Sequence, residues 1–360
     1  MNGRENKIKN LIETSKSVIM DCCLENGAIV AANSAKPYYS KDVMNYSYVW
    51  PRDAFFTCMA ADILGMKDVQ ENYFSWLMER AEGWKQTGLF YEKYELNGLQ
   101  ALHRFQPDQT GCAIISVWNC FRNDMKEAEK YKELIIRSAD GLCKAWEKNH
   151  FTIPTNDLWE ERSTFPELED FFVYSLCACI KGLLCAHESF PDERYVSKAE
   201  EMKDLIFEYT KKEDNLYRSF GKINDYSIDA SLLGAVWPFE ILFPDDPLAV
   251  NTLKLIEDEL VKDFGVFRYK GDVYDGGMYR GQLRNKGAGF WPLLNFWMCI
   301  VLAKMGRKSE AENYYFKVID SLENEFIPEQ IFSNKIQKSI SPLCWSHSMF
   351  IIATKELGYL

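Results

Sequence analysis

The sequence predicts an all-α fold in which six pairs of helices form a closed ring. Apolar residues recur at spacings of three and four, as on one face of a helix, and the strict alternation typical of strands is scarce. Helices that are apolar on nearly all sides alternate with helices that carry charges on one face. The links between the helices alternate as well, between short and long.

About twelve helices are expected along the chain. Their ranges are 5–24, 51–64, 68–84, 108–123, 126–147, 166–188, 192–212, 226–240, 246–262, 288–305, 308–324 and 342–357.

Local signals mark several helix ends. The segment Thr164-Phe165-Pro166-Glu167 matches a capping box. Asp246-Pro247 and Ser341-Pro342 each place a capping residue before a first-turn proline. Gly65 and Gly306 suit helix C-termini, where glycine adopts the left-handed conformation at little cost.

The alternation assigns the helices to two layers. A helix that is apolar all round is buried, so the even-numbered helices should form the inner layer and the amphipathic odd-numbered helices the outer one. Six hairpins in a ring place the long links at one end of the barrel, where we expect function. These links are 25–50, 85–107, 148–165, 213–225, 263–287 and 325–341.

Composition excludes several classes of protein. The net charge of −11, from 53 acidic and 42 basic residues, argues against a nucleic-acid partner. No apolar run reaches the roughly 18–20 residues of a membrane span, and the first ten residues lack the apolar core of a secretory signal. No linker-like stretch divides the chain, so we expect one domain over residues 1–360 and no membrane partner.

The eleven cysteines indicate the compartment. Their odd number and their scatter through apolar segments do not match a disulfide framework, and they lack the spacing of a zinc site. We expect reduced, buried thiols in a cytoplasmic protein that needs neither a metal nor a cofactor.

The long links combine aromatic residues with charged or amide side chains. Flat apolar surfaces suit sugar faces, and charged hydrogen-bonding groups suit hydroxyls, so the composition suggests a sugar site with two catalytic carboxylates. Each motif alone also has a structural interpretation, such as a helix cap, an ion pair or a solvated charge cluster. The candidates are Tyr46, Tyr48, Trp50, Arg52, Asp53, Arg104, Gln106, Asp108, Asp157, Trp159, Glu160, Glu161, Arg268, Tyr269, Asp272, Glu329 and Trp345.

The order of these motifs resembles the glucoamylase family, the family 15 glycoside hydrolases, from about Tyr46 to the C-terminus. The matching pieces are Tyr48-Val49-Trp50-Pro51-Arg52-Asp53, Gln106-Pro107-Asp108, Asp157-Leu158-Trp159-Glu160-Glu161, Arg268-Tyr269-Lys270-Gly271-Asp272, Glu329-Gln330 and Leu343-Cys344-Trp345-Ser346. The resemblance implies an (α/α)6 barrel that releases β-glucose from non-reducing ends by inversion.

The resemblance also implies roles for single residues. It makes Glu160 the general acid and Glu329 the general base. The other implied roles are hydroxyl binding by Arg52 and Asp53, contacts around the same sugar by Glu161 and Arg268, a place beside the catalytic water for Tyr46, and aromatic walls from Trp50, Trp159 and Trp345.

Inversion sets requirements on the two carboxyl groups. Their separation should be roughly 6.5–9.5 Å, to leave room for a water. Glu160 has to hold a proton near neutral pH, so we expect it in an apolar, partly desolvated setting beside Trp159. Glu329 has to be ionised, so we expect it to be solvated or hydrogen-bonded.

The sequence departs from the family pattern in two places. Many members carry a tryptophan where this chain has Ala101-Leu102-His103, and Pro51 is typical of the prokaryotic branch. No accessory or starch-binding domain is expected, so the predicted substrates are short maltooligosaccharides. Activity on α-1,6-glucosides or trehalose, and a non-catalytic sugar-binding role, remain alternatives.

Overall fold

The computed structural model describes residues 3–210, 214–278, 286–334 and 336–360. The α-helices are α1 (Gly3–Cys22), α2 (Pro51–Ile63), α3 (Lys67–Arg80), α4 (Trp84–Thr87), α5 (Pro107–Phe121), α6 (Lys132–Ala145), α7 (Val173–Ser189), α8 (Glu193–Thr210), α9 (Pro247–Leu260), α10 (Pro292–Lys304), α11 (Lys308–Ser321) and α12 (Cys344–Glu356). Three 3-10 helices are η1 (Glu127–Tyr131), η2 (Pro166–Leu168) and η3 (Ala230–Ala235).

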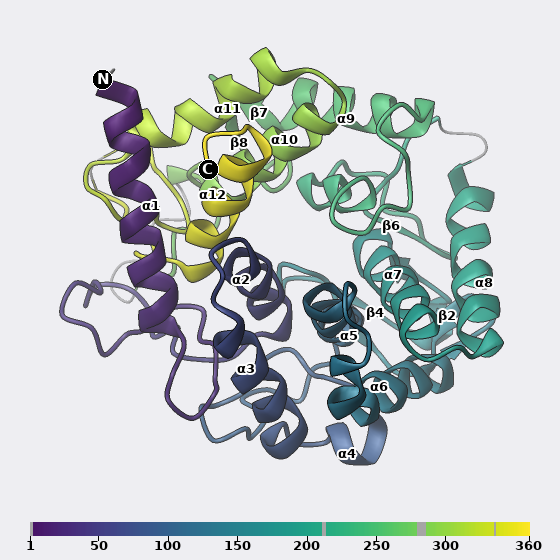
Figure 1. The fold of residues 1–360 in the computed structure, drawn as a ribbon. Coiled ribbons are helices and arrows are strands. Elements are labelled where there is room, and N and C mark those ends of the chain that lie inside the picture. The colour runs from purple at the N-terminus through teal and green to yellow at the C-terminus, as the bar shows by residue number, and fades with distance from the viewer. Residues whose placement is uncertain (1–2, 211–213, 279–285, 335) are drawn as a thin grey trace.

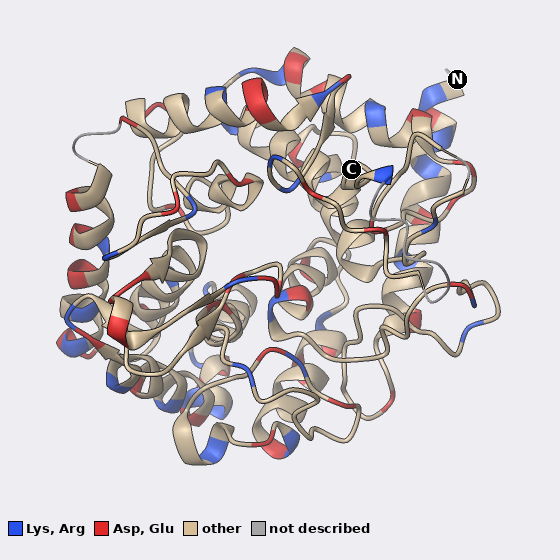
Figure 2. Cartoon of the chain, turned by 180° about the vertical axis from the view of Figure 1, so that it is seen from behind, with Lys and Arg blue, Asp and Glu red and all other residues tan. Residues whose placement is uncertain are grey.

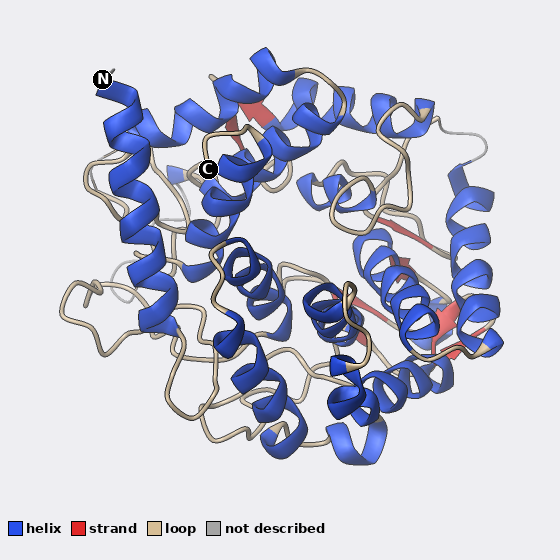
Figure 3. Ribbon diagram, viewed as in Figure 1, coloured by secondary structure: helices blue, strands red, loops and turns tan. Residues whose placement is uncertain are grey.

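Short antiparallel strand pairs lie in the connections between the helices (Figure 3). The pairs are β1 (Trp146–Glu147) with β2 (His150–Phe151), β3 (Thr155–Asn156) with β4 (Ser163–Thr164), β5 (Phe171–Phe172) with β6 (Ser219–Phe220), and β7 (Val261–Lys262) with β8 (Gly265–Val266).

The helices form two concentric layers (Figure 1). In the inner layer α2, α5, α7, η3, α10 and α12 pack against one another in this order, and α12 returns to α2, which closes the ring. The outer helices α3, α6, α8, α9 and α11 each pack on the inner element that precedes or follows them, and α1 packs on α12. The predicted all-α (α/α)6 barrel is confirmed.

Burial follows the predicted alternation. In α10 every residue from Pro292 to Leu302 is buried, whereas α8 buries only one face and turns its charges outward. Charged side chains accordingly lie mainly on the outer helices and the loops (Figure 2). Within the inner layer α5 and α7 approach most closely at Gly111, where a Cβ atom would lie 2.4 Å from the Ala178 carbonyl oxygen.

The eighth predicted helix, 226–240, is wrong in extent, because only η3 forms there. Asp229 accepts a hydrogen bond from the Ser231 amide and thereby fixes the start of this short element. Pro238 cannot continue a helix beyond it, since proline lacks the amide hydrogen. The inner layer therefore contains five α-helices and one 3-10 helix among the described residues.

Other helix starts also differ from the expectation. The helices expected from 126 and 288 begin as α-helices at Lys132 and Pro292. The helix expected from 166 begins at Val173, because Phe171 and Phe172 pair with β6 instead. Thr164 does not cap a helix; it pairs with Thr155 in the β3–β4 ladder. The helix expected from 342 begins at Cys344.

The remaining end signals agree better with the structure. Asp246 caps α9 by accepting from the Leu248 amide at 2.8 Å. Gly65 and Gly306 follow α2 and α10 with φ of 70° and 76°. Residues 211 and 212 of the predicted helix 192–212 lie outside the described residues.

The long connections meet at one end of the barrel. Isolated β-bridges join Val49 to Tyr94, Phe105 to Thr155, Asp229 to Tyr269, Val43 to Met278 and Phe290 to Ile331, and the Cys344 amide donates to the Ala31 carbonyl. These contacts tie the long connections, and residues next to them, to one another around the mouth of the ring.

Two findings on the described residues bear on the partners. None of their helices is both long enough and apolar enough to cross a membrane. No group of three or more histidine, cysteine, aspartate or glutamate side chains is placed there to hold a metal ion. All eleven cysteines are free, and eight of them are buried.

Candidate active site

A cavity of about 290 Å³ opens among the long connections. Three inner helices, α2, α10 and α12, begin at its wall, so first-turn residues of these helices face it. Its lining residues are Met44, Tyr46, Trp50, Arg52, Asp53, Lys93, Leu158, Trp159, Glu160, Glu161, Arg268, Tyr274, Trp291, Leu293, Glu329, Leu343 and Trp345.

The cavity brings together most of the candidates that the sequence indicates, including both carboxylates. The candidates that line it are Tyr46, Trp50, Arg52, Asp53, Trp159, Glu160, Glu161, Arg268, Glu329 and Trp345. The candidates outside the lining are Tyr48, Arg104, Gln106, Asp108, Asp157, Tyr269 and Asp272.

Gln106 and Asp108 lie behind Arg52 and hold its guanidinium. Arg52 Nη1 donates to Gln106 Oε1 at 3.0 Å and to Asp108 Oδ2 at 3.2 Å. Its Nη2 lies 3.3 Å from Asp53 Oδ1, at the start of the same helix. Burial raises the pKa of Asp53 to about 6, although the Arg52 charge acts in the opposite direction. A rigid cation and a carboxyl group therefore meet at this wall of the cavity.

Asp157 builds the turn that presents Glu160. Its Oδ1 accepts from the amides of Glu161 and Arg162, at 2.8 Å and 3.0 Å. The Glu160 amide donates to the Asp157 carbonyl oxygen at 3.1 Å, and Glu160 has a φ of 62°, which is uncommon for a residue other than glycine. Such backbone conformations cluster at functional sites because the surrounding structure has to maintain them.

The setting of Glu160 differs from the apolar one expected. Trp50 Nε1 donates to Glu160 Oε1 at 2.6 Å, and Lys93 Nζ donates to Oε2 at 3.4 Å. The side chain of Glu160 is 24% exposed. Glu160 is partly desolvated beside Trp159 as expected, but its setting is not apolar, because Lys93, which belongs to no recognised motif, contributes a cation there.

Glu329 is hydrogen-bonded by Tyr46 rather than solvated, which agrees with one of the two settings expected for it. Glu329 is 5% exposed, and its Oε2 atom has no hydrogen-bond partner in the described part of the chain. Burial raises its pKa to about 8, while the Arg268 charge and a hydrogen bond from Tyr46 act to lower it. The enclosing aromatic residues remove water from this carboxyl group.

Tyr46 and Tyr274 lie beside Glu329. Their hydroxyl oxygens are 2.9 Å apart. The Tyr274 ring stacks on the Trp291 ring with centroids 6.0 Å apart. The Trp159 ring packs against the same Trp291 ring, with centroids 5.6 Å apart. These three aromatic rings form one continuous part of the cavity lining.

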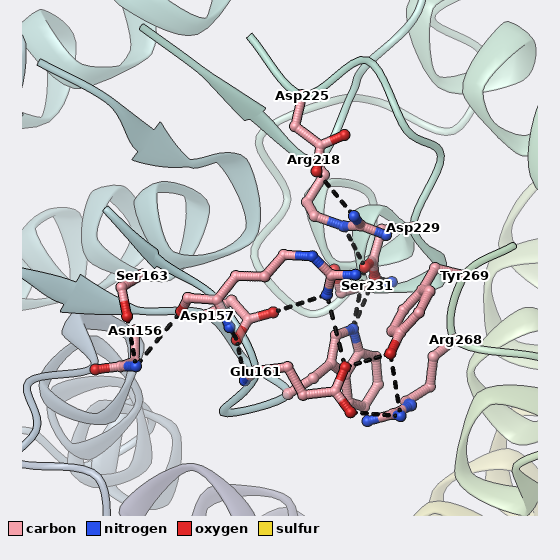
Figure 4. Close-up of polar contacts among 12 residues, drawn as sticks. Asn156, Asp157, Glu161, Ser163, Arg218, Asp225, Asp229, Ser231, Arg268 and Tyr269 are labelled. Atoms are coloured by element: carbon pink, nitrogen blue, oxygen red, sulfur yellow. Dashed lines mark hydrogen bonds and ion pairs between the residues drawn. The ribbon is translucent and has the colours of Figure 1, made fainter. Parts of the chain in front are cut away.

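Arg268 is joined to Glu161 and Tyr269 at one end of a cluster of polar contacts on the cavity wall (Figure 4). It donates to both carboxylate oxygens of Asp272, each at 2.7 Å, and to Glu161 Oε1 at 2.8 Å. The Tyr269 hydroxyl donates to the other oxygen of Glu161. Asp272 and Tyr269 thus orient Arg268 and Glu161 from outside the cavity.

Trp159 is oriented by two residues that the sequence did not indicate. Asp229 accepts from its indole Nε1, and Arg218 Nε donates to Asp229 at 3.0 Å (Figure 4). Neither residue belongs to a recognisable motif, so no sequence signal pointed to them.

Other residues of the lining were missed for different reasons. Trp291 directly precedes α10 and was hidden in the apolar pattern of the predicted helix 288–305. Lys93 and Tyr274 are single residues in long connections without a motif. Of the two remaining candidates, Tyr48 packs edge-on against Trp50 at 6.0 Å, and Arg104, whose side chain is 46% exposed, lies 3.6 Å from Glu92.

Comparison with known proteins identifies the family. The family model described as Glycosyl hydrolases family 15 matches residues 79–355. The chain belongs to this family of glycoside hydrolases.

Three curated proteins are similar to this chain in sequence. The chain is 28% identical to an uncharacterised glycosyl hydrolase of Methanocaldococcus jannaschii, over 98% of this chain and 57% of the relative. It is 24% identical to the isomaltose glucohydrolase of Kribbella flavida, over 87% of this chain and 85% of the relative. It is 23% identical to a trehalase of Mycobacterium tuberculosis, over 79% of this chain and 45% of the relative. The chain thus spans little more than half of the methanocaldococcal protein.

Solved structures share the fold. A wild-type glycosidase has a TM-score of 0.80 at 22% identity, with 100% of both chains covered. A bacterial glucoamylase complexed with acarbose has a TM-score of 0.74 at 20% identity, with 96% of this chain and 55% of that chain covered.

Proposed function

We propose that the chain is an inverting, exo-acting α-glucosidase that releases β-D-glucose from the non-reducing ends of maltooligosaccharides or related α-glucans. One observation carries this proposal. Glu160 and Glu329 come from the third and sixth long connections, yet both line one cavity walled by aromatic rings. Two carboxyl groups that flank a sugar site are the machinery of glycoside hydrolysis.

The reaction assigns one proton transfer to each carboxyl group. Glu160 gives its proton to the glycosidic oxygen as the bond from that oxygen to the anomeric carbon breaks. Glu329 takes a proton from a water whose oxygen forms the new bond on the opposite face of the sugar. Exchange with solvent then returns each group to its starting state, so inversion consumes one water for each bond cleaved.

Four charged side chains of the cavity would bind the hydroxyls of the terminal glucose: Arg52, Asp53, Glu161 and Arg268. They present charged groups that are already held by neighbours, so little ordering remains to be done when the sugar binds. Burial raises the pKa of Glu329 to about 8 even though the Arg268 charge and the Tyr46 hydrogen bond lower it, so the carboxylate that catalysis requires is favoured at mildly alkaline pH.

The cavity volume supports action at chain ends. About 290 Å³ lies at the lower limit of the ~300–1,000 Å³ usual for ligand sites, which suits a terminal sugar unit rather than the middle of a polymer.

Two alternatives concern the linkage and the chemistry. Relatives named isomaltose glucohydrolase and trehalase favour α-1,6-glucosides and trehalose as alternative substrates for the same carboxyl groups. A sugar-binding protein without activity is the other alternative; pairing of two carboxyl groups in one cavity argues against it, because binding alone requires neither.

Glutamine variants test the proposal. Glu160→Gln and Glu329→Gln should each lose at least ~100-fold in activity on the best substrate among maltotriose, isomaltose and trehalose. Near-normal activity of either variant would contradict the role assigned to that residue. Absence of turnover by the unmodified protein on all three sugars would favour the binding alternative.

We also propose a cytoplasmic location. The free thiols support it, because reduced, mostly buried cysteines are typical of a reducing compartment.

A further inference from the structure

A buried carboxyl group behind Glu160 has no part in the proposed chemistry. Glu92 is 0% exposed, and neither of its carboxylate oxygens has a hydrogen-bond partner among the described residues. It does not line the cavity. An ionised carboxylate in such a place is costly unless a charge compensates for it. The groups around Glu92 should therefore show what compensates for the charge of this buried carboxylate.

The surroundings of Glu92 are two cations, and one of them also contacts Glu160. Lys93 Nζ lies 3.4 Å from Glu92 Oε1 and 3.4 Å from Glu160 Oε2. Arg104 Nη1 lies 3.6 Å from Glu92 Oε2. The Lys93 ammonium also lies 4.9 Å from the centre of the Trp50 ring, whose indole donates to Glu160. One ammonium is therefore shared by two carboxyl groups.

Lys93 alone would work against a general acid. A positive charge within about 4 Å favours the ionised form of a carboxyl group, whereas a general acid has to hold its proton until the bond breaks. Glu92, which shares this ammonium with Glu160, offsets its charge and repels the ionised form of Glu160. The two effects of Glu92 act in the same direction, toward a protonated Glu160.

We propose that Glu92 is a positioning residue that keeps Glu160 protonated at neutral pH by neutralising and holding Lys93. The inference rests on the proposed role of Glu160 as the general acid. Burial and then the charge of Glu160 raise the pKa of Glu92, so the two carboxyl groups affect each other's ionisation.

Other charged or titratable side chains also face Glu160. They are Arg52, Asp53, Glu329, Tyr46 and Tyr274. All of them stay in place when the pair of Glu92 and Lys93 is changed, so the two substitutions below isolate the contribution of that pair.

Two substitutions with opposite expected effects test the inference. In Glu92→Gln the ammonium is left mainly to Glu160, so the basic limb of the pH profile of kcat/KM should move to lower pH by about one pH unit or more. In Lys93→Met the cation is lost, so the same limb should move to higher pH. The acidic limb should stay in place in both variants. Glu95→Gln removes an exposed carboxyl group of the same segment and should match the unmodified protein.

An unmoved basic limb in Glu92→Gln, or a shift of both variants in the same direction, would overturn the inference. A general disturbance of the fold cannot produce shifts of opposite sign. If Glu92→Gln fails to fold, Lys93→Met still tests the inference, because its basic limb should move to higher pH. A basic limb that is unmoved or lowered in Lys93→Met would overturn the inference.

A second substrate separates this inference from the proposed function. The fluoride of α-D-glucosyl fluoride leaves with little help from an acid. Glu160→Gln should therefore lose at least ~100-fold on the oligosaccharide and less than ~10-fold on the fluoride. Equal, near-normal activity of Glu160→Gln on both substrates would contradict the proposed function. The expected difference for Glu160→Gln together with an unmoved basic limb in Glu92→Gln would overturn the role of Glu92 alone.

Discussion

The indole Nε1 of Trp159 donates to both carboxylate oxygens of Asp229, at 3.0 Å and 3.1 Å. Trp159 lines the cavity directly before Glu160, whereas Asp229 is buried at the start of η3 and is held by Arg218. The cavity wall next to the proposed acid is therefore fixed by a connection more than sixty residues further along the chain. A neighbour that touches no substrate thereby acquires a role in the geometry of the site.

Asp229→Asn should reduce both activity and stability. An amide has one acceptor oxygen where the carboxylate has two, so it cannot accept from Trp159, Arg218 and the Ser231 amide together, and the indole loses its fixed orientation. We expect kcat/KM to fall by roughly 10–100-fold and the free energy of unfolding by about 1–3 kcal/mol. Steady-state kinetics and urea unfolding measure the two effects.

Asp225→Asn is the matched control for this prediction. Asp225 pairs with Arg218 at 2.8 Å and does not contact Trp159, so this variant should keep its activity. An equal loss of activity in both variants would show that the charge balance of Arg218, rather than the orientation of Trp159, is responsible.

Arg268→Lys should impair sugar binding although the charge is kept. A lysine ammonium cannot reproduce the paired hydrogen bonds to Asp272 together with the bond to Glu161. We expect kcat/KM to fall by roughly 100-fold on the best substrate. Lys270→Gln, which changes a side chain on the same segment that is 81% exposed, should change it less than about threefold. Activity of Arg268→Lys within about threefold of the unmodified protein would refute this role.

Tyr46→Phe should shift the pH profile of kcat/KM. A hydrogen bond from Tyr46 lowers the pKa of Glu329, which burial raises to about 8. Loss of the hydroxyl should raise that pKa further, so the acidic limb, which reports ionisation of the base, should move to higher pH. Tyr274→Phe leaves the Tyr46 hydroxyl in place and should move the limb less. An acidic limb that moves to lower pH in Tyr46→Phe would contradict this account of the base.

The same carboxyl group should make stability depend on pH. Because the pKa of Glu329 is raised from 4.5 to about 8 on folding, the native state binds more protons than the unfolded state between these values. The contribution of Glu329 to stability is therefore fully present below about pH 4.5 and is lost as the pH rises toward 8. Glu329→Gln removes this dependence, so its Tm relative to the unmodified protein should rise between pH 5 and pH 8. A difference in Tm that stays constant or falls between pH 5 and pH 8 would show that folding does not raise the pKa of Glu329.

The fold was predictable because the signal repeats along the chain. Helices with nearly all residues buried, such as α10, differ in pattern from helices with one buried face, such as α8, and the alternation of the two kinds defines a two-layered ring. The segment 226–240 is the exception, because it forms a 3-10 helix where an α-helix was predicted. Its apolar residues from Ile228 to Phe239 are buried as the pattern suggests, but Asp229 and Pro238 limit the helix. Burial alone does not distinguish a short 3-10 helix from a long α-helix.

The site was predictable only where motifs are local. The segment from Asp157 to Glu161 is contiguous, so its turn and its carboxyl groups could be identified together. Its electrostatic setting could not, because Lys93 and Glu92 reach Glu160 from another connection. The burial of Glu329 likewise depends on aromatic rings from several connections that meet only in the folded chain.

The anomer released first from the substrate tests the central claim most directly. The protein should be mixed with maltotriose, and with isomaltose and trehalose in parallel, and the anomeric protons followed by NMR before mutarotation becomes appreciable. Inversion predicts that β-glucose appears first from the maltooligosaccharide. Initial release of α-glucose would contradict the assignment of Glu160 and Glu329 as an inverting acid and base.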